Sequence, residues 1–396
     1  MKAAIIGASS ESLHTIEKAK TYNLTVVALD GNEKAEGLAA ADIAKVVNIS
    51  KEEDTIECIK QEQVDFVLTV PIGRYLTTIG SVNDTLGLPG IGKEQAIYCT
   101  DKLLFHEKMA KNSLRDCNCY EASAEEKERE ELYKKIENKV ATLQFPAILK
   151  PRFGSGSRGI HFVNNLQELK QGLEHTLGES YVLEECVAGE EYGLDGAVID
   201  GKFYMVLLRH KENTPLPARQ AVAYFSVMPD DEFYGQVKVF MERTVEVLGL
   251  QECLMHADLI RTTNGPFVIE LSARPSGHNL HNLFTPLCTG VDVAEQYIRH
   301  RMGMECSFVP EKTRRMMIHY FDLEGKIVSN PTQSEVRNVL GDSLKIWNCN
   351  IKTGDEVSKV SDGHSLMGRG YFVLEGISET DLKEKAQKIK ELFIME

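Results

Sequence analysis

Two acids on a predicted β-hairpin are the residues best suited to hold a metal ion. Asp258 lies in one apolar run and Glu270 in the next, and the Asn264-Gly265 pair between them is typical of a tight hairpin turn. Two hard oxygen ligands on neighbouring strands suit Mg²⁺, which binds few carboxylates and completes its shell with substrate phosphates. The alternative is a pair of ordinary acids at a sheet edge.

A glycine-rich loop follows a predicted strand in the segment F-P-A-I-L-K-P-R-F-G-S-G-S-R-G-I-H-F, residues 145–162. The strand delivers Lys150, and an apolar return strand follows the loop. Glycines let backbone N–H groups close over phosphate oxygens, and serines add hydroxyl donors. The loop residues that we expect to contact phosphate are Gly154, Ser155, Gly156, Ser157 and Gly159. The alternative is the tip of a flexible hairpin.

Further carboxylates crowd the segment Y-V-L-E-E-C-V-A-G-E-E-Y-G-L-D-G, residues 181–196. A strand ends in Glu184 and Glu185, and Glu190, Glu191 and Asp195 follow after a short linker. Such crowding beside a turn suits the amino group of adenine and the hydroxyls of ribose, although surface acids are the alternative.

Cations and histidines complete the candidate set. Lys211 and Arg219 follow a strand of the middle region, where they either bind phosphate or a substrate carboxylate or lie in a solvated loop. We place Lys211 among the catalytic residues. For His256, His278 and His281 we weigh substrate contact against ordinary packed or surface positions.

The first hundred residues alternate between strands and helices. Apolar runs predict strands at 2–6, 24–29, 45–49 and 64–70, and a helix is predicted at 10–21. This alternation is typical of a parallel sheet covered on both faces. Asp30 lies where a dinucleotide-binding domain places its ribose-binding acid, but the loop G-A-S-S-E-S lacks the second and third glycines of that motif. We therefore favour a Rossmann-like domain without a nicotinamide cofactor.

Turn signals and composition divide the rest of the chain. The run G-L-P-G-I-G at 87–92 suggests a boundary, and a helix is predicted from 93 to 110. The charge run at 124–139 indicates a solvated helix face. Strands at 181–183, 197–199, 203–208 and 267–271 mix with helices without strict alternation. Ser378 and Asp381 resemble a capping box before a final helix. We predict domains at 1–92, 93–310 and 311–396.

Composition narrows the classes of partner. The 396 residues carry 45 Lys and Arg against 59 Asp and Glu, a net charge of −14, which disfavours nucleic acid. No apolar run is long enough to span a membrane. Nine unclustered cysteines do not suggest a disulfide framework, so we expect a cytoplasmic location.

Five of these segments occur in the order found in the ATP-grasp superfamily, which the whole chain strongly resembles. They are Asp101-Lys102, the Lys150 strand, the glycine-rich loop, E-E-C-V…G-E-E, and I-E-L-S-A-R-P-S-G at 269–277. The resemblance is to the branch with biotin carboxylase, glycinamide ribonucleotide synthetase and the L-amino acid ligases. It implies an α/β and α+β fold: an N-terminal Rossmann-like (pre-ATP-grasp) domain, a central ATP-grasp domain with a glycine-rich lid near 145–185, and a small C-terminal α+β domain.

The resemblance also implies roles for single residues. Lys102 and Lys150 resemble the phosphate-binding lysines, Glu184 the adenine contact, Val187 the linker residue whose backbone meets the ring, and Glu191 the ribose ligand. Asp258 and Glu270 resemble the metal carboxylates. Ser272 stands where the family often has a third ligand, commonly Asn. Arg274 resembles the arginine that holds a substrate or intermediate anion.

The implied activity is that of a ligase that joins a small carboxylate to an amine through an acylphosphate, with Mg-ATP converted to ADP and phosphate. Mn²⁺ is the alternative metal, and amino acids are the expected substrates. The alternative functions are a purine-pathway ligase, a bicarbonate-activating carboxylase and an inactive nucleotide-binding protein. For the assembly, the chain is open to forming a homodimer. The identity of the two substrates is not predicted.

Overall fold

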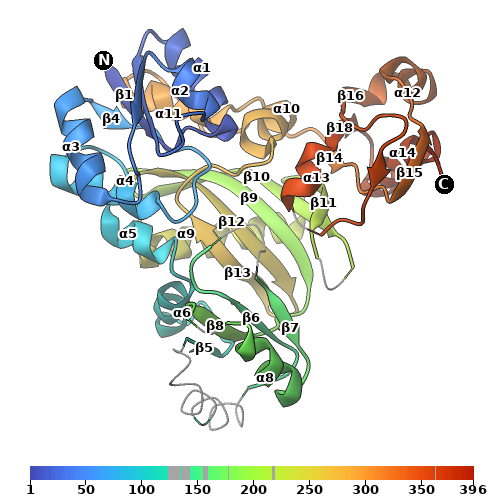
Figure 1. Ribbon diagram of the computed structural model, residues 1–396, viewed down its shortest axis with the longest axis horizontal. Coiled ribbons are helices and arrows are strands. Elements are labelled where there is room, and N and C mark those ends of the chain that lie inside the picture. The colour runs from blue at the N-terminus through green and yellow to red at the C-terminus, as the bar shows by residue number, and fades with distance from the viewer. Residues whose placement is uncertain (124–133, 135–142, 155–158, 177, 216–218, 362) are drawn as a thin grey trace.

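The computed structural model describes residues 1–123, 134, 143–154, 159–176, 178–215, 219–361 and 363–396 (Figure 1). Most of the predicted charge run at 124–139 therefore lies outside the described residues. No helix in the described ranges is long and apolar enough to cross a membrane.

The N-terminal region is a parallel sheet with helices, as the alternation predicts. Its strand order is β3-β2-β1-β4, with bounds Lys2–Ile6 (β1), Thr25–Asp30 (β2), Ile43–Val46 (β3) and Phe66–Val67 (β4). The helices are η1 (Ser10–Ser12), α1 (Leu13–Thr21), α2 (Glu36–Ala40), α3 (Glu52–Glu62) and α4 (Leu76–Leu86). Asp30 accepts a 2.7 Å hydrogen bond from the Ala8 backbone N–H. The carboxylate that a ribose would need is thus engaged by the loop itself.

The prediction of one continuous helix from 93 to 110 is wrong, because two helices occupy this range. They are α5 (Lys93–Tyr98) and α6 (Lys102–Lys111). Asp101 lies between them with extended backbone, and its carboxylate accepts from the N–H groups of Leu103 and Leu104. This N-cap satisfies donors that a new helix leaves unpaired, so α6 begins at Lys102.

A large antiparallel sheet forms the centre of the molecule. Its strand order is β13-β12-β9-β10-β11-β14-β18-β16. The bounds are Glu190–Ile199 (β9), Lys202–Asn213 (β10), Ala221–Ser226 (β11), Cys253–Thr262 (β12), Gly265–Ser272 (β13), Met316–Tyr320 (β14), Leu344–Cys349 (β16) and Gly370–Glu375 (β18). Helix α9 (Glu232–Leu248) buries Phe233, Val237 and Met241 in the same core as Leu194 and Leu259 of this sheet.

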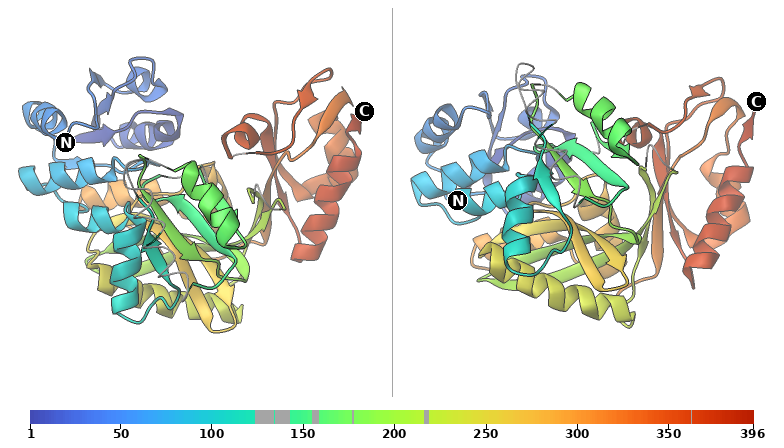
Figure 2. Two further views of the ribbon diagram at one scale, coloured as in Figure 1. Left: turned by 60° about the horizontal axis from the view of Figure 1, so that its bottom comes forward. Right: turned by 90° about the horizontal axis from the view of Figure 1, so that it is seen from below.

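A small sheet carries the glycine-rich segment and lies beside the large one (Figures 1 and 2, green). Its order is β5-β8-β6-β7, with bounds Cys119–Glu121 (β5), Ala147–Pro151 (β6), His161–Val163 (β7) and Tyr181–Glu185 (β8). Helix α8 (Leu166–Glu174) packs Leu169 and Leu173 against Leu149 and Leu183 of the strands. The segment therefore has a hydrophobic core of its own.

The C-terminal region continues the large sheet through β14, β18 and β16 and adds a second sheet. This sheet has the order β17-β15-β19, with bounds Gly325–Ser329 (β15), Glu356–Val357 (β17) and Ile394–Met395 (β19). The remaining helices are η3 (Leu280–Phe284), α10 (Thr285–Thr289), α11 (Val293–Arg301), α12 (Gln333–Leu340), η4 (Gly341–Ser343), α13 (Gly363–Gly368) and α14 (Glu379–Glu391). Ser378 caps α14 by accepting from the Asp381 N–H, but the Asp381 carboxylate accepts from Ile377 instead of completing a capping box.

The α/β and α+β fold class predicted from the sequence is confirmed by these sheets. The proposed domain bounds at 92/93 and 310/311 stay a prediction.

Candidate active site

The two predicted metal acids face each other across the hairpin of β12 and β13. Asp258 is the direct cross-strand partner of Glu270. Residues in such positions have Cβ atoms about 5 Å apart, close enough for their carboxylates to share one ligand. The predicted hairpin around Asn264-Gly265 is confirmed, and it is what sets this register.

Lys211 binds one of these acids. Its Nζ lies 2.6 Å from Oδ1 of Asp258, and its side chain is only 7% exposed. Burial alone would lower the pKa of Lys211, but the Asp258 carboxylate raises it above its ordinary value. The same pairing lowers the pKa of Asp258 against the opposing effect of burial. The solvated-loop alternative for Lys211 is therefore wrong, because β10 runs on to Asn213 and places Lys211 within the sheet.

Arg219 lies at the other end of the same region. Its guanidinium forms a 2.7 Å ion pair with Glu191, the predicted ribose ligand. Its backbone has a φ of 42°, which belongs to the left-handed region. The pair fixes Glu191 on β9.

The glycine-rich segment contacts the first predicted phosphate lysine. Lys102 is the first residue of α6, and its Nζ donates a 2.9 Å hydrogen bond to the Gly154 carbonyl. Burial lowers the pKa of Lys102, and the Lys150 charge lowers it further while Glu270 opposes the change. Gly154 (φ 141°) and Gly159 (φ 70°) frame the loop, whose predicted contacts Ser155, Gly156 and Ser157 lie outside the described residues.

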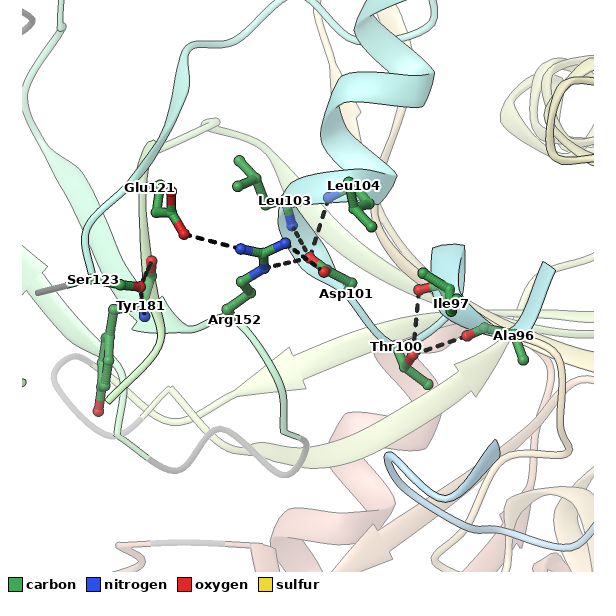
Figure 3. Close-up of polar contacts among 10 residues, drawn as sticks. All are labelled: Ala96, Ile97, Thr100, Asp101, Leu103, Leu104, Glu121, Ser123, Arg152 and Tyr181. Carbon is green, nitrogen blue, oxygen red and sulfur yellow. Dashed lines mark hydrogen bonds and ion pairs between the residues drawn. The ribbon is translucent and has the colours of Figure 1, made fainter. Parts of the chain in front are cut away.

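Arg152 joins the base of this loop to the start of α6 (Figure 3). Its Nε and NH2 bind the two carboxylate oxygens of Asp101 at 2.8 and 2.7 Å, and its NH1 donates to Glu121 at 3.0 Å. The paired N–H groups of arginine match a carboxylate in this way. Asp101 therefore caps the helix that begins with Lys102 and holds the strand that ends before the loop.

The second predicted phosphate lysine is buried in an ion cluster. Lys150 Nζ lies 3.1 Å from Oε2 of Glu184, and Arg115 NH2 lies 2.7 Å from Oε1. Burial alone would raise the pKa of Glu184, but the charges of Arg115 and Lys150 hold it at about 2. Glu184, the predicted adenine contact, is thus an anion with two cations.

Glu185 and Val187 continue the chain beyond this cluster. The Glu185 carboxylate accepts from the backbone N–H groups of Asn118 and Gln144 and from the Asn118 amide. Neighbouring residues of a strand point to opposite faces, so Glu185 and Glu184 face different sides of the small sheet. Val187 lies between β8 and β9. The nucleotide-binding roles of both residues stay predictions.

A pocket gathers five of the predicted residues from three separate segments. Lys102, Gly154, Glu270, Ser272 and Arg274 all line it. The loop at 72–74 and residues 98–101 complete its wall, together with Phe105 and Leu271. Phosphate-binding, metal-binding and anion-binding candidates therefore border one space.

Arg274 has unused hydrogen-bonding capacity in this pocket. Its NH1 donates to the Pro275 carbonyl at 2.8 Å, while its buried Nε has no hydrogen-bond partner among the described residues. Burial lowers the pKa of Arg274, and Glu270 and Asp258 oppose this change. A guanidinium with a free edge can bind a planar anion.

The three candidate histidines, His256, His278 and His281, make contacts with the protein itself. His256 is the cross-strand partner of both Asp195 and Ser272, and burial together with the Arg274 charge lowers its pKa to about 3. His281 is fully buried and makes a short contact to the Ser276 carbonyl. His278 accepts at its carbonyl from the Tyr320 hydroxyl, and its N–H donates to Glu11. These contacts support the packed alternative for His281.

The oxygen donors present fit Mg²⁺. In the described ranges no three His, Cys, Asp or Glu side chains come together as an all-protein metal site. Glu270 lines the pocket together with Lys102, and Asp258 is its cross-strand partner. A carboxylate pair beside a phosphate-binding candidate suits an ion that also takes phosphate oxygens. Asp258 and Glu270 would hold it, with Ser272 on the same strand as Glu270.

Sequence reasoning missed Arg115, Arg152 and Arg74. Arg115 and Arg152 contact candidate residues, and Arg74 lines the pocket. Arg152 carried a signal, since it directly follows Lys150-Pro151 at the loop. Arg115 and Arg74 stand in no motif, and only the fold brings them to the site.

Comparison with known proteins finds a matching domain and several relatives for part of the chain. Residues 143–281 match the ATP-grasp domain. The L-arginine-specific L-amino acid ligase of Bacillus subtilis is 22% identical over 239 residues, covering 58% of this chain and 55% of that protein. The D-alanine–D-alanine ligase of Lacticaseibacillus casei is 28% identical over 146 residues, covering 33% and 38%. The chain thus spans about half or less of the length of these curated relatives.

The fold extends the likeness over the whole chain. The crystal structure of an L-amino acid ligase from Bacillus licheniformis matches with a TM-score of 0.78 at 17% identity, covering 100% of this chain and 98% of that one. The large sheet, the small sheet and the N-terminal parallel sheet therefore have the arrangement of this ATP-grasp fold. Residues 143–281 of this protein thus match the ATP-grasp domain, and the chain as a whole has the fold of an L-amino acid ligase structure.

Proposed function

We propose that this protein is an ATP-dependent carboxylate–amine ligase. The observation that carries the proposal is the pocket in which Lys102, Gly154, Glu270, Ser272 and Arg274 meet. Two of the curated relatives are named as ligases that join amino acids, which supports amino acids as substrates.

The reaction has two steps. A carboxylate oxygen of the acid attacks the γ-phosphorus of ATP, the bond to the β-phosphate oxygen breaks, and ADP leaves. The amine then attacks the acylphosphate carbonyl, phosphate leaves, and the amine releases a proton as the amide forms. Such phosphoryl transfer depends on positioning and charge neutralisation more than on protein nucleophiles.

The chain's own residues would supply that environment. Lys102 and Lys150 would bind phosphate oxygens, the loop around Gly154 would cover them, and Arg274 would orient the carboxylate and the acylphosphate. Asp258 and Glu270 would hold Mg²⁺, which supplies neutralisation of phosphate charge when bound. Glu184, Val187 and Glu191 would bind adenine and ribose, and Lys211 would keep Asp258 ionised.

A screen of amino-acid pairs tests this proposal. ADP release should require both an acid and an amine, and it should disappear when Mg²⁺ is removed by a chelator. ADP release with bicarbonate instead of an amino acid would favour a carboxylase of the same fold, an alternative suggested by a biotin carboxylase domain among the structural neighbours. Nucleotide binding without turnover for any pair would favour an inactive nucleotide-binding protein.

A further inference from the structure

We propose that Arg115 is a positioning residue that ties the strand of the metal acid Glu270 to the phosphate lysine Lys150. This inference rests on the proposed function, because it concerns the same nucleotide site. Arg115 lies in the connection between α6 and β5, outside every motif of the sequence.

The NH1 group of Arg115 contacts the large sheet. It donates to the carbonyls of Val268 at 3.1 Å and Ile269 at 3.2 Å, the two residues directly before Glu270 on β13. The guanidinium also lies over the ring of Phe267, with 4.7 Å to the centroid. The position of the Glu270 strand is therefore fixed from the side by one buried cation.

The NH2 group of Arg115 contacts the small sheet. The 2.7 Å contact from NH2 to Glu184 continues through the 3.1 Å contact from Glu184 to Lys150. Among the described residues the two sheets share no ladder hydrogen bonds, so this chain of contacts through Arg115 and Glu184 joins them. A lysine has no planar guanidinium with which to donate to two carbonyls on one side and place a charge against Glu184 on the other.

Arg115 also decides the charge of Glu184 once nucleotide binds. Phosphates that share the Lys150 charge leave Arg115 as the remaining strong partner of this buried carboxylate. The other titratable groups near Glu184 add little positive charge: burial raises the pKa of the thiols of Cys117, Cys119 and Cys186. Burial and the Arg115 charge lower the pKa of His106 to about 4, so its imidazole is neutral at pH 7.5. Lys102 is itself one of the cations that we place on phosphate, so the nucleotide engages its charge as well. A buried carboxylate without a cation takes up a proton.

Proton uptake on ATP binding separates positioning from simple packing. Calorimetric titration with Mg-ATP at pH 7.5, in two buffers of different ionisation enthalpy, gives the number of protons taken up. We expect ATP binding to Arg115→Met to be accompanied by the uptake of as many as about one more proton per ATP than in the wild type. The additional proton binds to Glu184, which becomes neutral. Adding Glu184→Gln to Arg115→Met should remove the difference. Equal uptake by wild type and Arg115→Met would overturn the inference.

Arg115→Lys keeps the inference testable if Arg115→Met fails to fold. This variant retains a charge for Glu184 but loses the bonds to β13, so we expect ATP affinity within a few-fold of wild type and turnover reduced by about tenfold or more. Unchanged turnover would contradict the tie to Glu270. If the wild-type protein binds no ATP, the proposed function itself is wrong. That result differs from the one that contradicts the role of Arg115, so the two failures can be distinguished.

Discussion

Each cation that we place on phosphate already has a partner in the protein. Lys150 pairs with Glu184, and Lys102 donates to the Gly154 carbonyl. Lys211 likewise pairs with the metal acid Asp258. Buried charges require such partners, and a ligand that takes them over replaces one set of contacts with another. The charges of these cations are therefore already compensated within the protein, and a ligand that binds them exchanges partners.

Lys150→Ala should weaken ATP binding and leave the fold intact. Arg115 still pairs with Glu184 in this variant, so the buried carboxylate does not lose all compensation. We expect ATP affinity to fall by about tenfold or more, as for loss of a hydrogen bond to a charged group. Calorimetric titration measures it, with Lys111→Ala as the matched control because Lys111 is exposed at the far end of α6. Equal affinity in both variants would remove Lys150 from the phosphate site.

Glu270→Gln and Ser272→Ala distinguish a charged metal ligand from a neutral one. A carboxylate offsets the charge of Mg²⁺, whereas a hydroxyl only completes its coordination. We expect Glu270→Gln to abolish Mg-dependent ADP release and Ser272→Ala to retain part of it. The reverse ranking in a steady-state assay would show that the ligands are assigned wrongly.

At the scale of elements, the start of α6 connects helix capping to the glycine-rich loop. Asp101 caps the helix and binds Arg152, so two substitutions separate its roles (Figure 3). Asn is a good N-cap but lacks the charge for Arg152. Asp101→Asn should keep thermal stability near that of wild type and raise the KM for ATP.

Asp101→Ala should in addition lose about 1 kcal/mol of unfolding free energy, as N-cap removal typically does. Denaturant titration of the two variants measures the difference. If Asp101→Asn binds ATP as the wild type does, the contact with Arg152 does not position the loop.

The elements nearest a strong local pattern could be predicted from the sequence. The β12–β13 hairpin follows from Asn264-Gly265 between apolar runs, and with it the pairing of Asp258 and Glu270. The break at Asp101 was missed, because apolar spacing continues through it and the cap depends on one side chain. Lys211 was predicted to follow its strand, with a solvated loop as the alternative, because the strand continues through polar residues, which a buried ion pair makes tolerable.

At the scale of the whole molecule, the contacts between distant segments could not be predicted. The eight-stranded sheet combines strands from residues 190 to 375, and β11 pairs with β14. His210 of β10 contacts Glu379 at the start of α14 at 3.0 Å. Such pairings depend on tertiary packing, which leaves no short-range pattern in the chain. The position of Arg115 beside Glu184 likewise depends on tertiary packing and has no short-range pattern in the sequence.

Buried titratable groups should make the unfolding free energy depend on pH. Burial, together with the Arg115 charge, lowers the pKa of His106 to about 4 from an ordinary 6.5. Between these values the unfolded chain binds the proton and the native protein does not, so stability falls as pH falls from 6.5 toward 4. The slope from one such group is at most about 1.4 kcal/mol per pH unit.

His106→Gln should flatten this slope, while its stability relative to wild type should be constant above pH 7. Denaturant unfolding at pH 7.5, 6 and 5 measures both quantities. Below pH 4.5 both proteins should lose further stability, because Glu184 and Asp195, with pKa values of about 2, must be protonated in the unfolded chain. An identical slope for wild type and variant between pH 6.5 and 5 would contradict the buried neutral imidazole.

The fate of a carboxylate oxygen tests the proposed ligase most directly. The amino-acid pair that gives the most ADP is supplied with ¹⁸O in the carboxylate of the acid, and the released phosphate is analysed by mass spectrometry. An acylphosphate intermediate transfers one carboxylate oxygen to phosphate, so we predict one ¹⁸O in each phosphate and one amide per ADP. Unlabelled phosphate, or no acid–amine pair that raises ADP release above the rate with ATP alone, would contradict the account.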